Sequence, residues 1–334
     1  MDVLANALAA MRVGPTRIAR TGACAPWGLG FPAVTGATFH VLLKGSCWLL
    51  PAGPVATGVA PVRLGAGDVL FLRDGNPHAL ADDPASPVVP FAPSDWSASS
   101  TISRVEIDGP GPRSLLLCGA YQLGRTRPHP LMAELPEVLH LPAQPTRHPE
   151  LRAMTELLAA ELSAELDQAR PGRDGIVPAL VDAMLLYILR AWVVDRAAEA
   201  ALGLGPAGWP SAITDRAVGR ALQVIYDDPA RPWTVQQLGA HGGLSRSVFA
   251  QRFTAMVGEP PLTCLTWWRM TMAGRLLRDS DMPLSVVAQR VGYSSEFAFS
   301  KAFRREFGTA PGRYRREPAV EPAAESAAEP AVEI

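Results

Sequence analysis

The sequence predicts an α+β protein with an N-terminal β-barrel, a helical hairpin and a C-terminal all-α domain. Three observations support this order. Short apolar runs separated by glycine turns fill residues 36–120, two apolar stripes at helical spacing follow, and a segment near residue 234 recurs 50 residues later. The chain has 334 residues, which favours two domains because a single hydrophobic core rarely grows beyond about 300 residues.

The first module, which we expect at residues 1–145, is predicted to be all-β. Its apolar runs have the length of typical strands, and turn residues such as Lys44-Gly45 and Gly65-Ala66-Gly67 separate them. The runs are TFHVLL, CWLL, VRL, VLFL, SRVEI and SLLLCGAYQL. Many short strands joined by glycine turns are typical of a barrel or a sandwich.

The stretch from Gly67 to His78 carries the clearest motif of this module. It follows the spacing G-D-x4-P-x-G-x2-H, with Arg73 where the pattern has proline. It resembles the motif of the cupin family, which implies a cupin barrel with His78 pointing into its mouth. Metal-dependent cupins add an earlier H-x-H and a glutamate, whereas the matching strand here offers His40 alone. We therefore expect no cofactor, and a metal near His40 and His78 is the alternative.

Two helices are predicted to follow as a hairpin at residues 148–198, with a break at Arg170-Pro171-Gly172. Their apolar stripes are Leu151, Met154, Leu157, Leu158 and Leu162, and then Leu180, Met184, Tyr187, Ile188 and Ala191. We expect this hairpin to form a homodimer, and packing against the barrel is the alternative.

Two further segments define the organisation around the hairpin. Residues 176–194 are the most apolar stretch, but Pro178, Asp182 and Arg190 interrupt it, so we expect no membrane span. Residues 199–210 end in GLGPAGWP and are expected to form a linker between the domains. The first residues, MDVLANALAAMRVG, lack the regions of a signal peptide, so we expect a cytoplasmic protein.

An internal repeat relates residues 234–261 to residues 284–311. An offset of 50 superimposes Gly242 on Gly292, Ser245 on Ser295, Phe249 on Phe299, Phe253 on Phe303, Gly258 on Gly308 and Pro261 on Pro311. Each copy predicts a short helix (234–240 and 284–291), a glycine turn and a helix that begins at the serine, which is the layout of a helix-turn-helix. A longer helix over 262–277 joins the copies and can hold two recognition helices about 34 Å apart on DNA.

The second helix of each copy predicts a face that reads DNA, because its two phenylalanines face the local core. The expected contact residues are Arg246, Ser247, Ala250, Gln251 and Thr254 in the first copy and Glu296, Phe297, Ser300, Lys301 and Arg304 in the second. Gln251 suits adenine, and Lys301 and Arg304 suit guanine or phosphate. Phe297 suits a thymine methyl group. The alternative is that these faces are merely solvated helix surface.

The distribution of charge supports the nucleic-acid interpretation. Residues 211–316 hold 15 Lys and Arg against 8 Asp and Glu, although the whole chain has a net charge of −1. Such a basic block indicates a polyanionic partner. Residues 317–334 hold five Glu among Pro and Ala without a core-forming pattern, so we expect a disordered acidic tail.

The stretch VVAQRVGYSSEFAFSKAFRREFGTAPGRYRR (Val286 to Arg316) resembles the signature of AraC/XylS-type transcription regulators, and the resemblance covers about residues 212–316. It implies a DNA-binding domain at 211–316 that binds double-stranded promoter DNA, joined to a sensing and dimerising domain. The family places Ser247, Ala250 and Gln251 at contact positions, although Ala250 is too short for hydrogen-bond readout. The resemblance implies a regulator without enzymatic activity, more often an activator, whose further partner would be RNA polymerase.

The effector is predicted to be an oxidant or a small molecule. The cupin and AraC-type arrangement, with ARTGACAPW and SLLLCGAYQL, is similar to a group of reactive-chlorine sensors. That similarity implies that Cys24 crosses the barrel mouth and that Cys118 approaches it, so that the two thiols close a disulfide. Cys24 is favoured as the sensor because it lies among Gly, Ala and Pro, outside the strand-like runs.

Four alternatives to this thiol switch remain open. In the first, three of the cysteines are small buried hydrophobic residues without a redox role, namely Cys47, Cys118 and Cys264. In the second, Cys24, His40, His78 and Cys118 hold a metal that oxidation releases. The third places a small organic effector in the barrel. The last is a metal-dependent cupin enzyme fused to a DNA-binding module.

Overall fold

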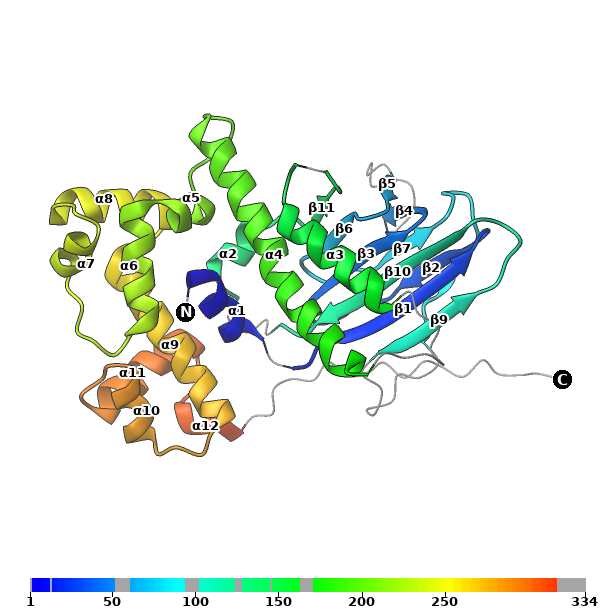
Figure 1. The fold of residues 1–334 in the computed structure, drawn as a ribbon. Coiled ribbons are helices and arrows are strands. Elements are labelled where there is room, and N and C mark those ends of the chain that lie inside the picture. The colour runs from blue at the N-terminus through cyan, green and yellow to red at the C-terminus, as the bar shows by residue number, and fades with distance from the viewer. Residues whose placement is uncertain are drawn as a thin grey trace.

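The structure is a computed structural model of the chain, and it describes residues 2–12, 14–51, 61–93, 102–123, 128–144, 146–162 and 171–316. The expected acidic tail at 317–334 lies outside the described residues. A β-rich part and a helical part stand side by side, joined by the long helix α4 (Arg173–Ala201) and by short helices at the junction (Figure 1). The α+β class predicted from the sequence is therefore confirmed.

Two sheets form the β-rich part. The six-stranded sheet has the order β11-β6-β3-β10-β1-β9 and the five-stranded sheet has the order β5-β4-β7-β2-β8. The strands are β1 (Arg17–Cys24), β2 (Gly28–Phe31), β3 (Ala37–Lys44), β4 (Ser46–Pro51), β5 (Val62–Gly65), β6 (Val69–Leu72), β7 (His78–Ala81), β8 (Val89–Pro90), β9 (Ser103–Ile107), β10 (Arg113–Tyr121) and β11 (Val138–Leu141). Each strand-like run of the sequence analysis forms all or most of a strand.

The six-stranded sheet is covered on both faces, which strand β6 illustrates. Leu70 and Leu72 pack between the two sheets, whereas Val69 and Phe71 belong to the core on the other face. Successive side chains of a strand point to opposite faces, so all four residues become buried. This double coverage explains why VLFL is a continuous apolar run instead of an alternating one.

Helices α3 (Pro149–Leu162) and α4 cover the outer face of the six-stranded sheet (Figure 1). The Tyr121 hydroxyl donates a hydrogen bond to the carbonyl oxygen of Val181 in α4 at 2.8 Å. Helix α4 is long and apolar enough to cross a membrane by length and composition, but half of its most apolar window is buried inside the protein. Asp182 of this helix pairs with Arg12 at 2.5 Å, which ties α4 to the end of α1.

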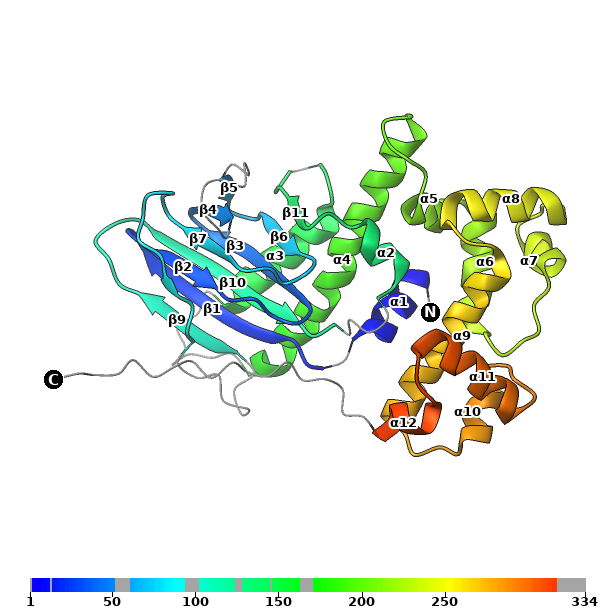
Figure 2. The ribbon, with the colours of Figure 1, turned by 180° about the vertical axis from the view of Figure 1, so that it is seen from behind.

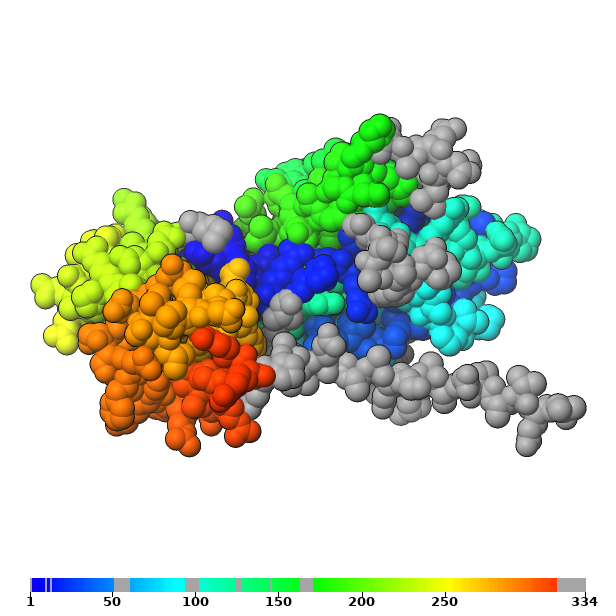
Figure 3. Space-filling model, turned by 90° about the horizontal axis from the view of Figure 1, so that it is seen from below, coloured from blue at the N-terminus to red at the C-terminus, as the bar shows by residue number. Residues whose placement is uncertain are grey.

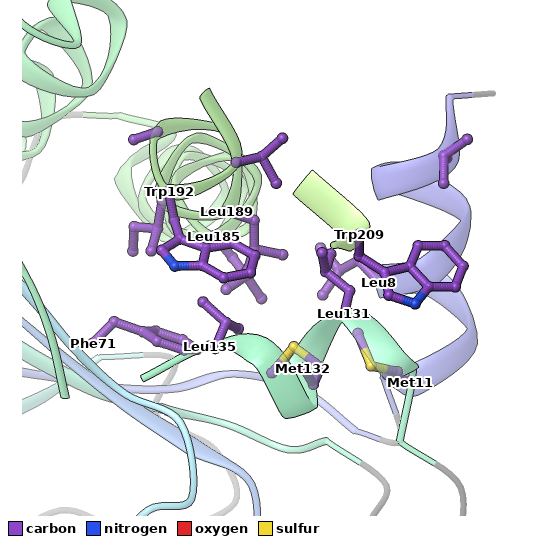
Figure 4. Close-up of a cluster of buried hydrophobic side chains, with 14 of the residues drawn as sticks. Leu8, Met11, Phe71, Leu131, Met132, Leu135, Leu185, Leu189, Trp192 and Trp209 are labelled. Atoms are coloured by element: carbon purple, nitrogen blue, oxygen red, sulfur yellow. The ribbon is translucent and has the colours of Figure 1, made fainter. Parts of the chain in front are cut away.

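The helical part begins at a junction formed by α1 (Val3–Met11), α2 (Pro130–Glu134), α5 (Trp209–Thr214) and α6 (Arg216–Asp227). Figure 2 shows α1 and α2 between the sheets and the helical part. In Figure 4, Leu131 of α2 and Leu8 of α1 lie beside Trp209 of α5, in one continuous apolar cluster. The hydrophobic core of the β-rich part thus continues into the helical part.

The expected linker at 199–210 is wrong at both ends. Helix α4 continues to Ala201, and Trp209 is the first residue of α5 with 2% of its surface exposed. The Glu134 carboxylate accepts the backbone N–H of Trp209 at 3.0 and 3.1 Å. A buried tryptophan at the start of a capped helix therefore replaces the last two residues of the expected linker, and the segment between the helices is residues 202–208.

Six further helices complete the helical part, and they are α7 (Val235–His241), α8 (Arg246–Val257), α9 (Pro261–Asp279), α10 (Leu284–Arg290), α11 (Glu296–Phe307) and α12 (Pro311–Arg316). Helix α9 packs against elements of both halves. The second half has its own core, centred on Phe299 and Phe303. Figure 3 shows the two halves next to each other, away from the sheets.

Candidate nucleic-acid interface

The first helix-turn-helix unit consists of α7, a glycine turn and α8. Thr234 and Gln237 form a capping box at the start of α7. At the turn, a Cβ added to Gly242 would lie 2.7 Å from the Cβ of Ala217 in α6. The glycine is thus required because α6 and the turn pack too closely for a side chain.

In the second unit Gly292 is also packed too closely for a side chain, but unlike Gly242 it has a positive φ of 79°, and it faces the first unit. A Cβ added there would lie 2.5 Å from the Ala230 carbonyl oxygen and 2.8 Å from Nη2 of Arg269. Arg269 of α9 donates to the carbonyl oxygens of Pro229 at 2.6 Å and Arg231 at 2.9 Å. Burial lowers the pKa of this guanidinium. Arg269 and Gly292 therefore help to fix the second unit against the loop between α6 and α7.

The outer face of α8 contains the residues expected to read DNA. Phe249 and Phe253 are buried, as the repeat predicted. Arg246, Ser247 and Gln251 are exposed, while Ala250 and Thr254 are partly buried. At about 100° per residue, Ser247, Gln251 and Thr254 lie on the side opposite the phenylalanines. The exposed face exists, and its contact with DNA stays a prediction.

The outer face of α11 is more strongly charged. Phe299 and Phe303 are buried, whereas Glu296, Lys301 and Arg304 are exposed and Ser300 is partly buried. Ser295 caps the helix by accepting the backbone N–H of Ala298 at 3.3 Å. Phe297 stands at the start of the helix with 80% of its surface exposed. An aromatic side chain this exposed is available for an apolar contact with a partner.

The sequence analysis missed two features of these faces. Val248 is 50% exposed beside Ser247, and Arg305 lies one residue beyond Arg304 on the same exposed side. Arg252 is used differently, because its Nε donates to the Asp215 carboxylate at 3.1 Å and ties α8 to the start of α6. A helical wheel drawn from the phenylalanines would have predicted that Val248 and Arg305 are exposed. The contact of Arg252 with Asp215 could not be predicted in this way, because the two residues are 37 positions apart in the sequence.

The barrel interior brings His40 and His78 together. Their Nε2 atoms lie 2.7 Å apart, and Nδ1 of His78 lies 2.9 Å from the Asn76 carbonyl oxygen. A carbonyl only accepts, so Nδ1 of His78 carries a proton and its Nε2 accepts from His40. Nδ1 of His40 is then a buried acceptor without a hydrogen-bond partner among the described residues. Burial lowers the pKa of both histidines, so the pair is neutral.

This pair does not fit a metal-dependent cupin site. Across the parts of the chain that the structure describes, no cluster of three or more His, Cys, Asp or Glu is placed to bind a metal ion. The aromatic ring of Phe31 stacks on His78 with a 5.0 Å centroid separation and contacts the ring of His40 edge-on at 4.6 Å. The two histidines therefore pack against an aromatic ring without a third metal ligand within the described ranges, and we assign no metal site to them.

The structure does not bring Cys24 and Cys118 together. In the pairing of β1 with β10, Cys24 is opposite Arg113 and Cys118 is opposite Ala19, a separation of roughly 17 Å along the strands. A disulfide needs Cα atoms within about 7 Å, so the expected approach of Cys118 to Cys24 is wrong for this conformation. Burial raises the pKa of Cys118 to about 12, whereas Cys24 is partly exposed.

Comparison with known proteins agrees with both halves of the chain. Residues 2–194 match the family described as Cupin, and residues 238–317 match the family described as Helix-turn-helix domain. A putative AraC-like transcription regulator of Streptomyces lividans is 32% identical over 320 residues, which cover 96% of this chain and 100% of the relative. A second one, from Streptomyces antibioticus, is 33% identical over 95% of this chain and 99% of its own. The RCS-specific HTH-type transcriptional activator RclR of Escherichia coli is 28% identical over 81% of this chain and 89% of its own.

Proposed function

The chain belongs to the AraC-like transcription regulators and joins a cupin domain to a DNA-binding helix-turn-helix domain, and from this we propose that it binds promoter DNA sequence-specifically as a homodimer under the control of an effector. The observation that carries the proposal is the pair of exposed faces on α8 and α11, which α9 joins. Gln251 on the first face supplies an amide for base readout, and Lys301 and Arg304 on the second supply positive charge.

The test of DNA recognition uses the purified chain and DNA from upstream of its own gene. We expect specific binding to exceed binding to a shuffled duplex by at least about a thousandfold at physiological salt. Binding of both duplexes with equal affinity over the whole salt range would contradict sequence-specific recognition. The salt dependence separates the phosphate contacts from the base contacts.

The proposed dimer uses the outer side of the hairpin. Met184 and Ile188 of the predicted stripe are buried against the sheet, but a second stripe on α4 remains accessible. It contains Ile176 and Val194, which are 42% and 50% exposed, and Leu157 of α3 in the same hairpin is also exposed. We expect Ile176→Glu/Val194→Glu to shift the chain from dimer to monomer in light scattering. Val248→Glu, an equally exposed valine on α8, serves as the control and should leave the mass unchanged.

The proposed effector is an oxidant that acts on Cys24. The accessibility of this thiol supports the proposal, and the burial of Cys118 argues that the first product is a sulfenic acid or a disulfide between protomers. Hypochlorite, which is reduced to chloride as it oxidises the thiol, should change the promoter affinity of the wild type but not of Cys24→Ala. Cys118→Ala should respond like the wild type. An equal response of wild type and Cys24→Ala would favour a small organic effector instead.

A further inference from the structure

A groove lies where the barrel side meets both helix-turn-helix units, and no function described above uses it, although its lining includes Arg305 from the exposed side of α11. Its volume is 660 Å³, within the range of small-molecule sites. Its lining includes Pro130 of α2, Trp209 of α5, and Arg305 and Glu306 of α11. The rest comes from the end of α8 and from the first residues of α9, so the barrel side and both helix-turn-helix units contribute to one site.

The wall of the groove is aromatic and apolar. Trp267 and Leu262 of α9 line it together with Val257 of α8. The ring of His129 lies edge-on to the Trp267 ring with 5.2 Å between centroids, which holds the indole in place. A fixed indole face is a favourable surface for a flat apolar group or for a cation.

The charge of the groove is negative. Arg305 pairs with Glu306 at 3.1 Å, so its positive charge is already compensated. Glu259 is exposed in the loop between α8 and α9, and within the described part of the chain no cation forms an ion pair with it. A ligand in the groove would therefore meet one uncompensated carboxylate next to an aromatic wall. This combination selects against anions and favours cations.

We propose that this groove binds an organic cation with an apolar body. The apolar body would cover Leu262 and Trp267, and the positive charge would lie near Glu259. Because the ligand would touch α2, α9 and α11 at once, its binding would favour one arrangement of the second helix-turn-helix unit relative to the barrel. This effect on DNA binding rests on the proposed function, whereas the binding site itself does not.

Two ions of the same shape and opposite charge test the site without DNA. Calorimetry of the full chain with tetraphenylphosphonium should show one binding site, and tetraphenylborate should not bind there. Glu259→Gln should weaken binding of the cation by about fivefold to tenfold, and Glu259→Lys should abolish it. Asp281→Asn, which neutralises an exposed carboxylate in the loop after α9, is the matched control and should bind the cation like the wild type.

Three results would overturn the proposed site: no binding of the phosphonium ion, equal binding of both ions, or equal effects of Glu259→Gln and Asp281→Asn. A second measurement compares promoter affinity with and without saturating cation, and the affinity should change in the wild type but not in Glu259→Lys. If calorimetry succeeds and the promoter affinity does not respond, the site stands without coupling. If the promoter is never bound, the proposed function fails and calorimetry alone decides on the site.

Discussion

Gln251 and Arg304 contribute to DNA binding through different physical interactions. The Gln251 amide both donates and accepts a hydrogen bond, which matches the major-groove edge of adenine. The Arg304 guanidinium carries a charge, which attracts any phosphate regardless of sequence. Because both side chains are accessible on their helices, the two contributions can be separated by mutation.

We expect Gln251→Ala to relax the preference at one base pair. Loss of one bidentate contact should cost about 1–3 kcal/mol on the preferred duplex and little on a shuffled one. The measurement is a set of affinities for single-base variants of the promoter site. Gln223→Ala on α6, where the amide bonds to Asp227 of the same helix, is the control. Equal losses on preferred and shuffled DNA would rule out a base-reading role for Gln251.

Arg304→Ala is expected to weaken binding to all sequences by a similar factor. Removal of one phosphate contact should reduce the slope of log affinity against log salt by about 1. Titrations at four or more salt concentrations measure this slope. Arg275→Ala removes an exposed arginine that pairs with Asp279 on α9, and its slope should equal that of the wild type. An unchanged slope in Arg304→Ala would mean that this side chain does not contact phosphate.

Individual residues were predictable where a local pattern determines their exposure. The buried phenylalanines of α8 and α11 follow from helical spacing, and they define which neighbours are exposed. The orientation of Cys24 and Cys118 was not predictable, because it depends on the register between β1 and β10, residues almost a hundred positions apart. The partnership of His40 with His78 likewise needs the two sheets to face each other.

At the level of elements, substitutions at Gly292 and Gly308 separate the effect of backbone strain from the effect of close packing. Both have a positive φ, 79° at Gly292 and 71° at Gly308, so any side chain is strained there. At Gly308 an added Cβ meets no atom within 4 Å, whereas at Gly292 it would meet the Ala230 carbonyl oxygen at 2.5 Å. Only the substitution at Gly292 therefore pushes the second unit away from the first.

Gly308→Ala should cost about 1 kcal/mol of stability through its backbone conformation. Gly292→Ala should cost roughly 1–3 kcal/mol more, because the added methyl group overlaps backbone atoms. It should also weaken binding to promoter DNA, since the spacing of α8 and α11 changes. Urea unfolding and promoter affinity measure the two effects. Equal stabilities of the two variants would show that the contact with Ala230 does not constrain the units.

The elements that sequence predicts well are those with strong local signals. The helix-turn-helix units were found because a glycine, a serine and two phenylalanines recur at one offset, although only the second serine caps its helix. Strands β1 and β2 were not recognised, because RIARTGAC and GLGF contain few of the branched or aromatic residues that favour strands. Trp209 was assigned to the linker because it follows Gly and Pro, and its burial comes from α2, whose Glu134 caps α5.

At the scale of the whole molecule, the barrel side and the DNA-binding domain meet at a junction that no local sequence pattern predicts. His129 lies just before α2, and its Nε2 is 2.7 Å from the hydroxyl of Tyr226 in α6. Its Nδ1 accepts the backbone N–H of Leu131 at 3.1 Å, and the ring of Trp209 lies edge-on at 4.7 Å. One imidazole thus connects the barrel side to the start of the DNA-binding domain. Its contact with Tyr226 joins residues 97 positions apart, which explains why the sequence did not reveal it.

Acid should weaken this junction through His129. Burial lowers the pKa of His129 from its usual 6.5 to about 3. Between these values the unfolded chain binds a proton that the folded chain does not, so stability is full above pH 6.5 and falls as the pH decreases towards 3. At pH 5 the loss from this one group is about 2 kcal/mol relative to pH 7.5.

The variant His129→Gln isolates that loss, because a glutamine keeps a polar partner for Tyr226 and does not titrate. Urea unfolding at pH 7.5 and pH 5 should show that the wild type loses about 2 kcal/mol more than the variant over this interval. The neutral histidines His40 and His78 are present in both proteins, so their contributions cancel in the comparison. A loss of equal size in the two proteins would mean that His129 is protonated in the folded chain and that acid does not act on stability through this junction.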